Sequence, residues 1–252
     1  MLSVQDWHNR FKQQAHWTGE IRRQLFSHLP ARGTVRVLEV GCGTGAVTEE
    51  LGSESTASIY GLDINFSYLR LAAQQDPSTR FSGGNGYALP FPPATFDLCY
   101  CHFLLLWLKD PAACLMEMRR TTKNGGIVAA FAEPDYGGRI DYPDTLVELG
   151  QLQAKSLEKQ GANPSIGRKL GRLFMDAGIK DVQIGLFGGN WGHLPSEEAQ
   201  ESEWAILQSD LEGMLPTARL QEFHNIDSVA WHMGERILFV PTFYAWGKVD
   251  HN

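Results

Sequence analysis

The stretch Val35-Arg-Val-Leu-Glu-Val-Gly-Cys-Gly-Thr-Gly45 is the most informative part of this 252-residue chain. Apolar residues dominate its first half and predict a short buried strand over 35–40. Three glycines follow at every second position, and an apparent helix over 46–51 begins directly after them. A glycine-rich turn between a strand and a helix lets backbone N–H groups approach a ligand, because no Cβ stands in the way. The stretch therefore predicts a nucleotide-type site at the carboxyl edge of a sheet.

Two classes of nucleotide cofactor fit this glycine pattern. The first two glycines and Ala46 match the G-x-G-x-x-G/A fingerprint of dinucleotide enzymes, and Asp63 supplies an acidic residue about 20 positions later. Gly45 instead completes a tighter G-x-G-x-G loop, which here follows the acidic residue Glu39. The glycines alone leave both classes open, together with a tight turn that binds nothing.

Composition and charge narrow the class of protein. A hydrophobic fraction of 43% and a charged fraction of 20% are ordinary for a globular protein. The formal net charge is −7 and no basic run occurs, which disfavours nucleic acid as a substrate. The first residues lack an apolar signal segment, and no apolar stretch is long enough for a stable membrane insertion. We therefore expect a cytoplasmic protein.

The cysteines do not indicate a metal site. The chain has four of them, at positions 42, 99, 101 and 114. Neither a second closely spaced pair nor a histidine lies at the spacing that zinc ligands require. We expect small buried thiols and no metal.

Strand and helix patterns alternate through the first half of the chain. This alternation predicts a mostly parallel sheet with helices on both faces. Two short helices are predicted over 5–29, meeting near Thr18-Gly19. Beyond residue 135 the pattern predicts helices over 144–160 and 167–177, strands over 182–187 and 236–245, and helical sequence between those strands. The other predicted strands cover 56–62, 80–82, 95–101 and 127–132, and the other predicted helices cover 66–75 and 110–122.

Several segments together resemble one family. Glu39-Val-Gly-Cys-Gly-Thr-Gly45 resembles motif I of the class I S-adenosylmethionine-dependent methyltransferases. Gly84-Asn-Gly-Tyr-Ala-Leu-Pro-Phe-Pro-Pro-Ala-Thr-Phe-Asp97 resembles the family segment Gly-Asp-Ala-x-x-Leu-Pro-Phe-x-x-x-x-Phe-Asp, which dinucleotide dehydrogenases lack. Lys109-Asp-Pro111 and Thr122-Lys-Asn-Gly-Gly-Ile-Val128 match the segments after the fourth strand and before the fifth. The resemblance is strongest to small-molecule enzymes of the ubiquinone and menaquinone biosynthesis group.

The resemblance implies a fold and a domain organisation. It implies a Rossmann-like α/β fold whose seven-stranded, mostly parallel sheet has its last strand antiparallel, formed here by residues 236–245. We expect a single domain over 1–252, with a helical N-terminal cap at 1–34 and a cofactor-binding core at 35–135. Residues 136–252 would supply the substrate-side helices and the last two strands.

The resemblance also implies that S-adenosyl-L-methionine is the cofactor. Glu39 and the glycine-loop backbone would meet its methionine part, and Asp63 would accept hydrogen bonds from the ribose hydroxyls. Asn85 stands where the family usually has Asp, and its amide oxygen can still accept from adenine. The implied cofactor-binding residues are Glu39, Gly41, Cys42, Gly43, Gly45, Asp63, Ile64, Asn85, Gly86 and Cys101.

The methyl acceptor is less well defined. His102 is a candidate general base, and His16, Trp17, Asp135 and Tyr136 are candidate substrate contacts. The chain lacks the Asn/Asp-Pro-Pro-Tyr/Phe motif of nucleic-acid amino-methylating enzymes and the carboxylates of metal-dependent catechol-type enzymes. A small molecule is therefore the expected acceptor, and apolar surface on the helices over 190–235 would suit a homodimer. An NAD(P)-dependent oxidoreductase and a non-catalytic methyltransferase-fold binding protein are the alternatives.

Overall fold

The computed structural model describes residues 3–29, 34–54, 57–187 and 195–251. Its main sheet has seven strands in the order β3-β2-β1-β4-β5-β9-β7. All neighbouring pairs from β3 to β5 are parallel, and β9 is antiparallel to both β5 and β7. This confirms the predicted sheet with its antiparallel last strand. The strands are β1 Arg36–Val40, β2 Ser58–Asp63, β3 Arg80–Gly83, β4 Phe96–His102, β5 Thr122–Pro134, β7 Lys180–Phe187 and β9 Thr242–Lys248.

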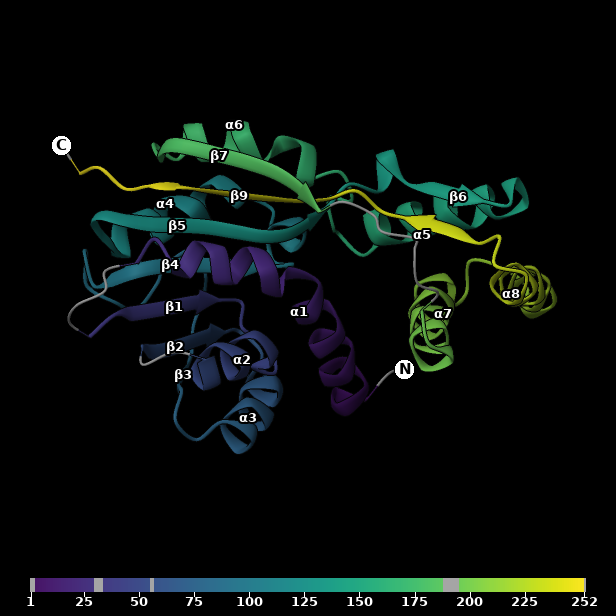
Figure 1. The fold of residues 1–252 in the computed structure, drawn as a ribbon, viewed down its shortest axis with the longest axis horizontal. Coiled ribbons are helices and arrows are strands. Elements are labelled where there is room, and N and C mark those ends of the chain that lie inside the picture. Colours follow the sequence, from purple (N-terminus) through teal and green to yellow (C-terminus); the bar gives the residue numbers. More distant parts are fainter. Residues whose placement is uncertain (1–2, 30–33, 55–56, 188–194, 252) are drawn as a thin grey trace.

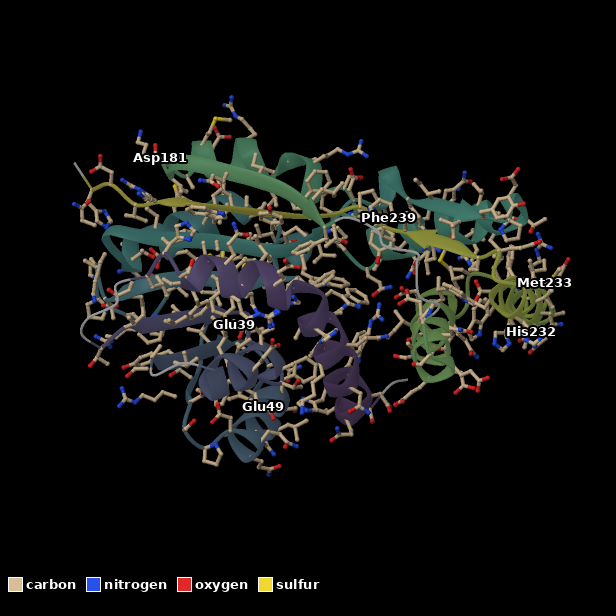
Figure 2. The ribbon with its side chains drawn as sticks, in the orientation of Figure 1. Glu39, Glu49, Asp181, His232, Met233 and Phe239 are labelled. Atoms are coloured by element: carbon tan, nitrogen blue, oxygen red, sulfur yellow. The ribbon has the colours of Figure 1, made fainter. Side chains whose placement is uncertain are left out.

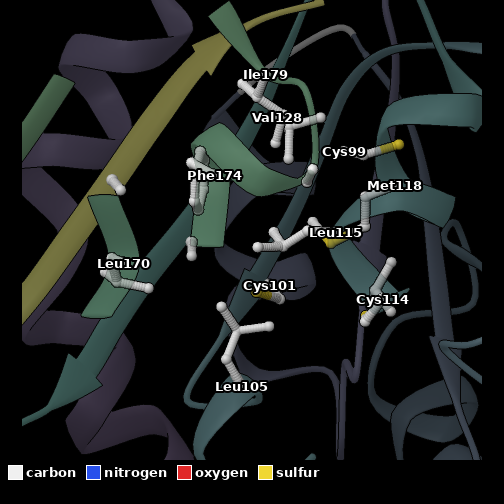
Figure 3. Packing of buried hydrophobic residues seen from close by; sticks show 14 of the residues in the cluster. Cys99, Cys101, Leu105, Cys114, Leu115, Met118, Val128, Leu170, Phe174 and Ile179 are labelled. Atoms are coloured by element: carbon white, nitrogen blue, oxygen red, sulfur yellow. The ribbon is translucent and has the colours of Figure 1, made fainter. Parts of the chain in front are cut away.

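Helices cover both faces of this sheet (Figure 1). Buried residues of α4 and α6 pack on one face of β4 and β5, and Figure 3 shows this cluster around Leu115 and Phe174. On the other face, Ala15 of α1 and Val47 of α2 belong to a second buried cluster. All four cysteines are free and buried. The helices are α1 Val4–Phe26, α2 Ala46–Glu54, α3 Phe66–Gln75, α4 Pro111–Thr121, α5 Val147–Lys159, α6 Leu170–Asp176, α7 Glu197–Leu211 and α8 Thr217–His232.

The predicted break between two N-terminal helices is wrong, because α1 continues through Thr18 and Gly19. Both residues are buried against the rest of the protein. A Cβ on Gly19 would lie 3.3 Å from Oε1 of Glu50, so the lack of a side chain on this glycine leaves room for α1 beside α2. The glycine serves close packing between two helices and not the end of one.

The predicted strand over 236–245 is also wrong in its bounds. Residues 237–239 form a separate strand, β8, and β9 begins only at Thr242. Pro241 lies between them, and proline cannot donate a hydrogen bond to a neighbouring strand. β8 pairs instead with β6 (Ile140–Tyr142) in a two-stranded sheet.

These two short strands and the helices α5, α7 and α8 form a side lobe beyond the main sheet (Figure 1). Its core is a third buried cluster that includes Leu149, Trp204 and Phe223. The side chain of Arg236 is fully buried and forms ion pairs with Asp141 at 2.8 Å and Asp227 at 2.6 Å. Buried charges are tolerated when they are paired in this way. Within the described residues, no helix combines the length and the hydrophobicity that crossing a membrane requires.

Candidate functional site

The glycine loop after β1 adopts the conformation that the sequence predicts. Gly41, Gly43 and Gly45 all have positive φ, at 75°, 53° and 81°. A Cβ on Gly41 would lie 2.7 Å from Leu104, and one on Gly43 would lie 3.1 Å from the Phe11 ring of α1. Larger residues would therefore be strained and crowded here.

The N–H groups of this loop are bonded within the protein. Gly41 and Cys42 both donate to the Leu62 carbonyl, at 2.7 and 3.0 Å. The Gly43 N–H donates to Oδ2 of Asp63 at 2.8 Å. These bonds fix the loop to the end of β2, and they also orient the Asp63 carboxylate.

One cavity adjoins this loop, and a second cavity borders the first. The glycine-loop cavity, of about 460 Å³, is lined by five of the predicted cofactor-binding residues, Glu39, Gly41, Cys42, Gly43 and Asp63, and by His102. The second cavity, of about 800 Å³, lies between α1, the end of the sheet and the side lobe. We call it the apolar cavity for its aromatic and aliphatic side chains, and polar and charged side chains such as Glu20 and Arg236 also line it. Phe239 of β8 is on its wall, where the sheet and the side lobe meet (Figure 2).

The two cavities share part of their walls. Five residues line both, namely Arg10, Gln14, Phe103, Pro134 and Tyr136. These residues form the common boundary of the two cavities. Of the five, only Tyr136 is among the site residues predicted from sequence.

The remaining predicted cofactor-binding residues line neither cavity. Gly45 packs near Ala72, and Cys101 is fully buried in the sheet core. The Ile64 side chain is 73% exposed. Asn85 accepts a hydrogen bond from the Tyr87 N–H at 3.0 Å.

Gly86 faces inward and also lies outside both cavities. A Cβ on it would lie 3.2 Å from Sγ of Cys114. This position supports the packing of α4 against the sheet.

Some of the candidate substrate contacts line a cavity, and others do not. Trp17 lines the apolar cavity, and the Arg10 guanidinium lies 5.1 Å from its ring centroid. Asp135 is buried in an ion pair with Arg168 at 2.6 Å and lines neither cavity. His16 is exposed on α1 and also lines neither cavity.

Glu39 is a buried carboxyl group at the end of β1, beside α1 (Figure 2). The Tyr100 hydroxyl donates to its Oε2 at 2.9 Å. Burial raises the pKa of Glu39 to about 8, and the nearby charge of Asp63 acts in the same direction. A cation in this cavity would favour the ionised form.

His102 contacts α1 through its ring. Its Nε2 lies 3.1 Å from Oγ1 of Thr18. Burial and the positive charge of Arg22 lower the pKa of His102 to about 3. The imidazole is therefore neutral near pH 7 and is a weak base.

The loop after β4 is held by Glu133, whose role was missed in the sequence. Its carboxylate is fully buried and accepts from the N–H groups of Leu104, Leu105 and Leu106, at 3.1, 2.9 and 3.1 Å. Phe103, at the start of this loop, has φ of 51°, which is uncommon for a residue with a side chain. The Glu133 bonds support this conformation and so position Phe103 between the cavities.

The described part of the chain holds no group of three or more His, Cys, Asp or Glu residues suited to a metal ion.

Comparison with known proteins identifies relatives of the chain. A family model described as a methyltransferase domain matches residues 38–130. An uncharacterized methyltransferase from Schizosaccharomyces pombe is 35% identical over 173 residues, which cover 63% of this chain and 61% of that relative. A demethylmenaquinone methyltransferase from Bacillus licheniformis is 32% identical over 197 residues, 71% of this chain and 83% of the relative.

A solved structure shares the fold. The YcgJ protein from Bacillus subtilis matches with a TM-score of 0.59 at 17% identity, covering 94% of this chain and 99% of that one. This likeness supports the arrangement of strands and helices described above.

Proposed function

The chain belongs to the S-adenosylmethionine-dependent methyltransferase family, and we propose that it transfers a methyl group from this cofactor to a small, largely apolar molecule. The observation that supports this most strongly is the meeting of the two cavities at Arg10, Gln14, Phe103, Pro134 and Tyr136. One cavity adjoins the glycine loop that the family uses for its cofactor. The other offers a separate space of suitable size for an acceptor.

The glycine-loop cavity has the chemistry that this cofactor requires. S-adenosylmethionine supplies a methyl group on a positively charged sulfur atom and also carries an ammonium group. Three carboxyl groups line the cavity, from Glu39, Asp63 and Asp210. Aromatic rings of Trp7, Phe11 and Tyr68 also line it, and such rings attract cations. The residues therefore fit the cofactor.

Two carboxyl groups have distinct roles in this proposal. Asp63 is oriented by the N–H groups of Gly43 and Asn65, at 2.8 and 2.7 Å, and would accept bonds from the ribose hydroxyls. Glu39 would pair with the ammonium group, whose positive charge favours the ionised carboxylate. Both roles use charge-assisted hydrogen bonds.

The apolar cavity suits an acceptor that has a hydrophobic part and also a polar group, because polar side chains such as Glu20 and Gln24 share its wall with apolar ones. Its wall contains many apolar and aromatic side chains, including Trp17, Ile21, Phe103, Leu186, Phe187, Trp231, Phe239 and Tyr244. Apolar walls exclude water and hold a ligand mainly by the surface that they bury. The Bacillus licheniformis relative is named for the methylation of demethylmenaquinone, and an acceptor with an apolar portion is consistent with that relationship.

We propose that alignment, and not a strong general base, accounts for most of the rate. His102 faces the glycine-loop cavity but has a pKa of about 3, which is far below neutrality. The Tyr136 hydroxyl has a pKa raised to about 12 by burial and stays protonated. Orientation of two reactants alone can supply effective molarities of about 10⁵ M or more.

Calorimetric titration with S-adenosylhomocysteine tests the cofactor part. We expect wild type and Asp176→Asn to bind alike, since Asp176 is in an exposed ion pair on α6. Asp63→Ala should bind at least about tenfold more weakly, because a carboxylate that takes two hydroxyl bonds is lost. Binding of NADH without S-adenosylhomocysteine would refute the proposal. Transfer of a radioactive methyl group to a panel of apolar and polar acceptors then tests the acceptor class.

A homodimer and a cytoplasmic location remain part of this proposal. Val229 of α8 and Met233, directly after this helix, are 57% and 63% exposed, as an apolar dimer surface requires. Sedimentation of the purified protein tests whether it is a dimer. Imaging of a tagged protein in its own host tests whether it is cytoplasmic.

A further inference from the structure

Arg10 stands out on the wall of the glycine-loop cavity. Its side chain is 8% exposed, and it is the only lysine or arginine among the described residues that line this cavity. Three carboxyl groups, those of Glu39, Asp63 and Asp210, line the same cavity. A buried cation in such surroundings requires a specific explanation.

Only one end of the Arg10 guanidinium group is bonded. Its Nη1 donates to Oε1 of Gln13 and pairs with Oε2 of Glu203, at 2.8 Å in each case. Its Nε is buried and has no hydrogen-bond partner. Within the described residues, no hydrogen bond joins Nη2 to another group either. The edge that carries two parallel N–H groups, which carboxylates bind bidentately, is thus unused.

The backbone N–H groups of the glycine loop cannot bind a ligand carboxylate unless the loop rearranges. The N–H groups of Gly41 and Cys42 are bonded to the Leu62 carbonyl, and that of Gly43 is bonded to Asp63. The loop therefore leaves room for a ligand, but these three N–H groups already donate hydrogen bonds within the protein. A negatively charged group in the cavity needs a donor from another element.

We infer that the Nε–Nη2 edge of Arg10, once the outer torsion angles of the side chain turn the buried Nε toward the cavity, binds the α-carboxylate of S-adenosylmethionine and of its demethylated product. The inference rests on the proposed function, since it concerns the same cavity. In this arrangement α1 contributes a charged contact to the cofactor, and Glu39 and Arg10 recognise opposite charges of one amino-acid group. Recognition of the amino-acid part of the cofactor would then depend on both Glu39 and Arg10. A ligand without the carboxylate would not bind to Arg10.

Calorimetry with two ligands tests this contact. The probes are S-adenosylhomocysteine and its decarboxylated analogue, which keeps the amine, the thioether and the adenosine. Arg10→Gln should weaken binding of S-adenosylhomocysteine by about tenfold or more, as expected for a lost charge-assisted bond, and leave the analogue within about twofold. Arg10→Lys should give an intermediate loss for the first ligand only, because lysine keeps the charge without the bidentate geometry.

A matched control separates this contact from a structural role. Glu203→Gln removes the ion pair between α1 and α7 but keeps Arg10, and we expect S-adenosylhomocysteine affinity to stay within about threefold. An equal loss in Glu203→Gln and Arg10→Gln, or an equal loss for both probes in Arg10→Gln, would overturn the inference. Unchanged affinity in Arg10→Gln with a raised KM for the acceptor would also overturn it and assign Arg10 to the acceptor. Failure of wild type to bind either probe would instead refute the proposed function itself.

Discussion

His8 of α1 and Thr44 of the glycine loop are in direct contact, with Nδ1 of the histidine 2.9 Å from Oγ1 of the threonine. The His8 side chain is buried, and its residue is only 2% exposed. The N-terminal helix is therefore bonded to the loop that it covers. Any change in this contact should alter access to the glycine-loop cavity.

The His8 contact should weaken in acid. Burial and the charge of Lys12 lower the pKa of His8 in the folded state, while Glu49 opposes them. The neutral form therefore stabilises the fold above about pH 6.5, and this contribution is lost as the pH falls through the folded-state pKa. Hydrogen exchange of α1 should become faster at low pH in wild type. In His8→Gln the pH dependence should be smaller, and an unchanged dependence would contradict the assignment to His8.

Binding of the cofactor product should release a proton at neutral pH. Burial raises the pKa of Glu39 to about 8, so it is mostly protonated at pH 7. Pairing with the ligand ammonium group favours the carboxylate and lowers this pKa. Titrations of S-adenosylhomocysteine in buffers with different ionisation enthalpies measure the number of protons released. We expect most of one proton at pH 7, almost none near pH 9.5, and none in Glu39→Gln.

The methyl-transfer rate should show no ionisation of His102 in the neutral range. Its pKa of about 3 keeps the ring neutral across the pH range in which enzymes are usually assayed. His102→Gln should lower kcat by less than about tenfold, which is below the usual contribution of a general base. A pH–rate profile with an acidic limb near pH 6 that disappears in His102→Gln would show that His102 is the base after all.

Loss of Glu133 should destabilise the protein strongly. In Glu133→Ala three backbone N–H groups lose their acceptor, which should reduce the free energy of unfolding by about 2–4 kcal/mol. Glu158→Ala, at an exposed position on α5, should change it by less than about 0.5 kcal/mol. Urea unfolding measures both. Equal effects of the two substitutions would show that the Glu133 bonds contribute little.

Stability should also depend on the protonation of Glu133. Burial raises its pKa to about 7 in the folded state. Its contribution is therefore fully present below the unfolded value near pH 4.5 and is lost as the pH rises through 7. Glu133→Gln cannot ionise, so its unfolding free energy should decline less than that of wild type between pH 4.5 and pH 8. Urea unfolding at several pH values tests this difference.

The fold could be predicted where local signals were decisive. Helix α3 lies at the predicted residues, because Asn65 caps its start and the chain turns at Asp76. Asp110 caps α4, as its position before Pro111 predicts. The break at Thr18-Gly19 was wrong because a glycine within a helix can serve contact with another helix, and the local sequence does not distinguish the two uses.

The site was predictable only in part, because some of its residues are placed by local sequence patterns and others by long-range packing. Glu39 and Asp63 follow strands of the sheet, so their meeting at one edge follows from the βαβ pattern. Arg10 and Gln14 come from a helix whose orientation over the glycine loop depends on long-range packing. Their sequence neighbourhood, an amphipathic helix with scattered charges, is typical of a solvent-facing surface. Only the folded structure places them on the wall that the two cavities share.

The split between β8 and β9 has an evolutionary consequence. One wall of the apolar cavity includes Leu238, Phe239 and Val240, and the residues that follow form the strand within the main sheet. The glycine loop belongs to the opposite half of the chain and shares no residue with this segment. Substitutions in 238–240 can therefore change which acceptors are accepted while the methyl donor stays the same. Relatives with a common donor could diversify their products through this short segment.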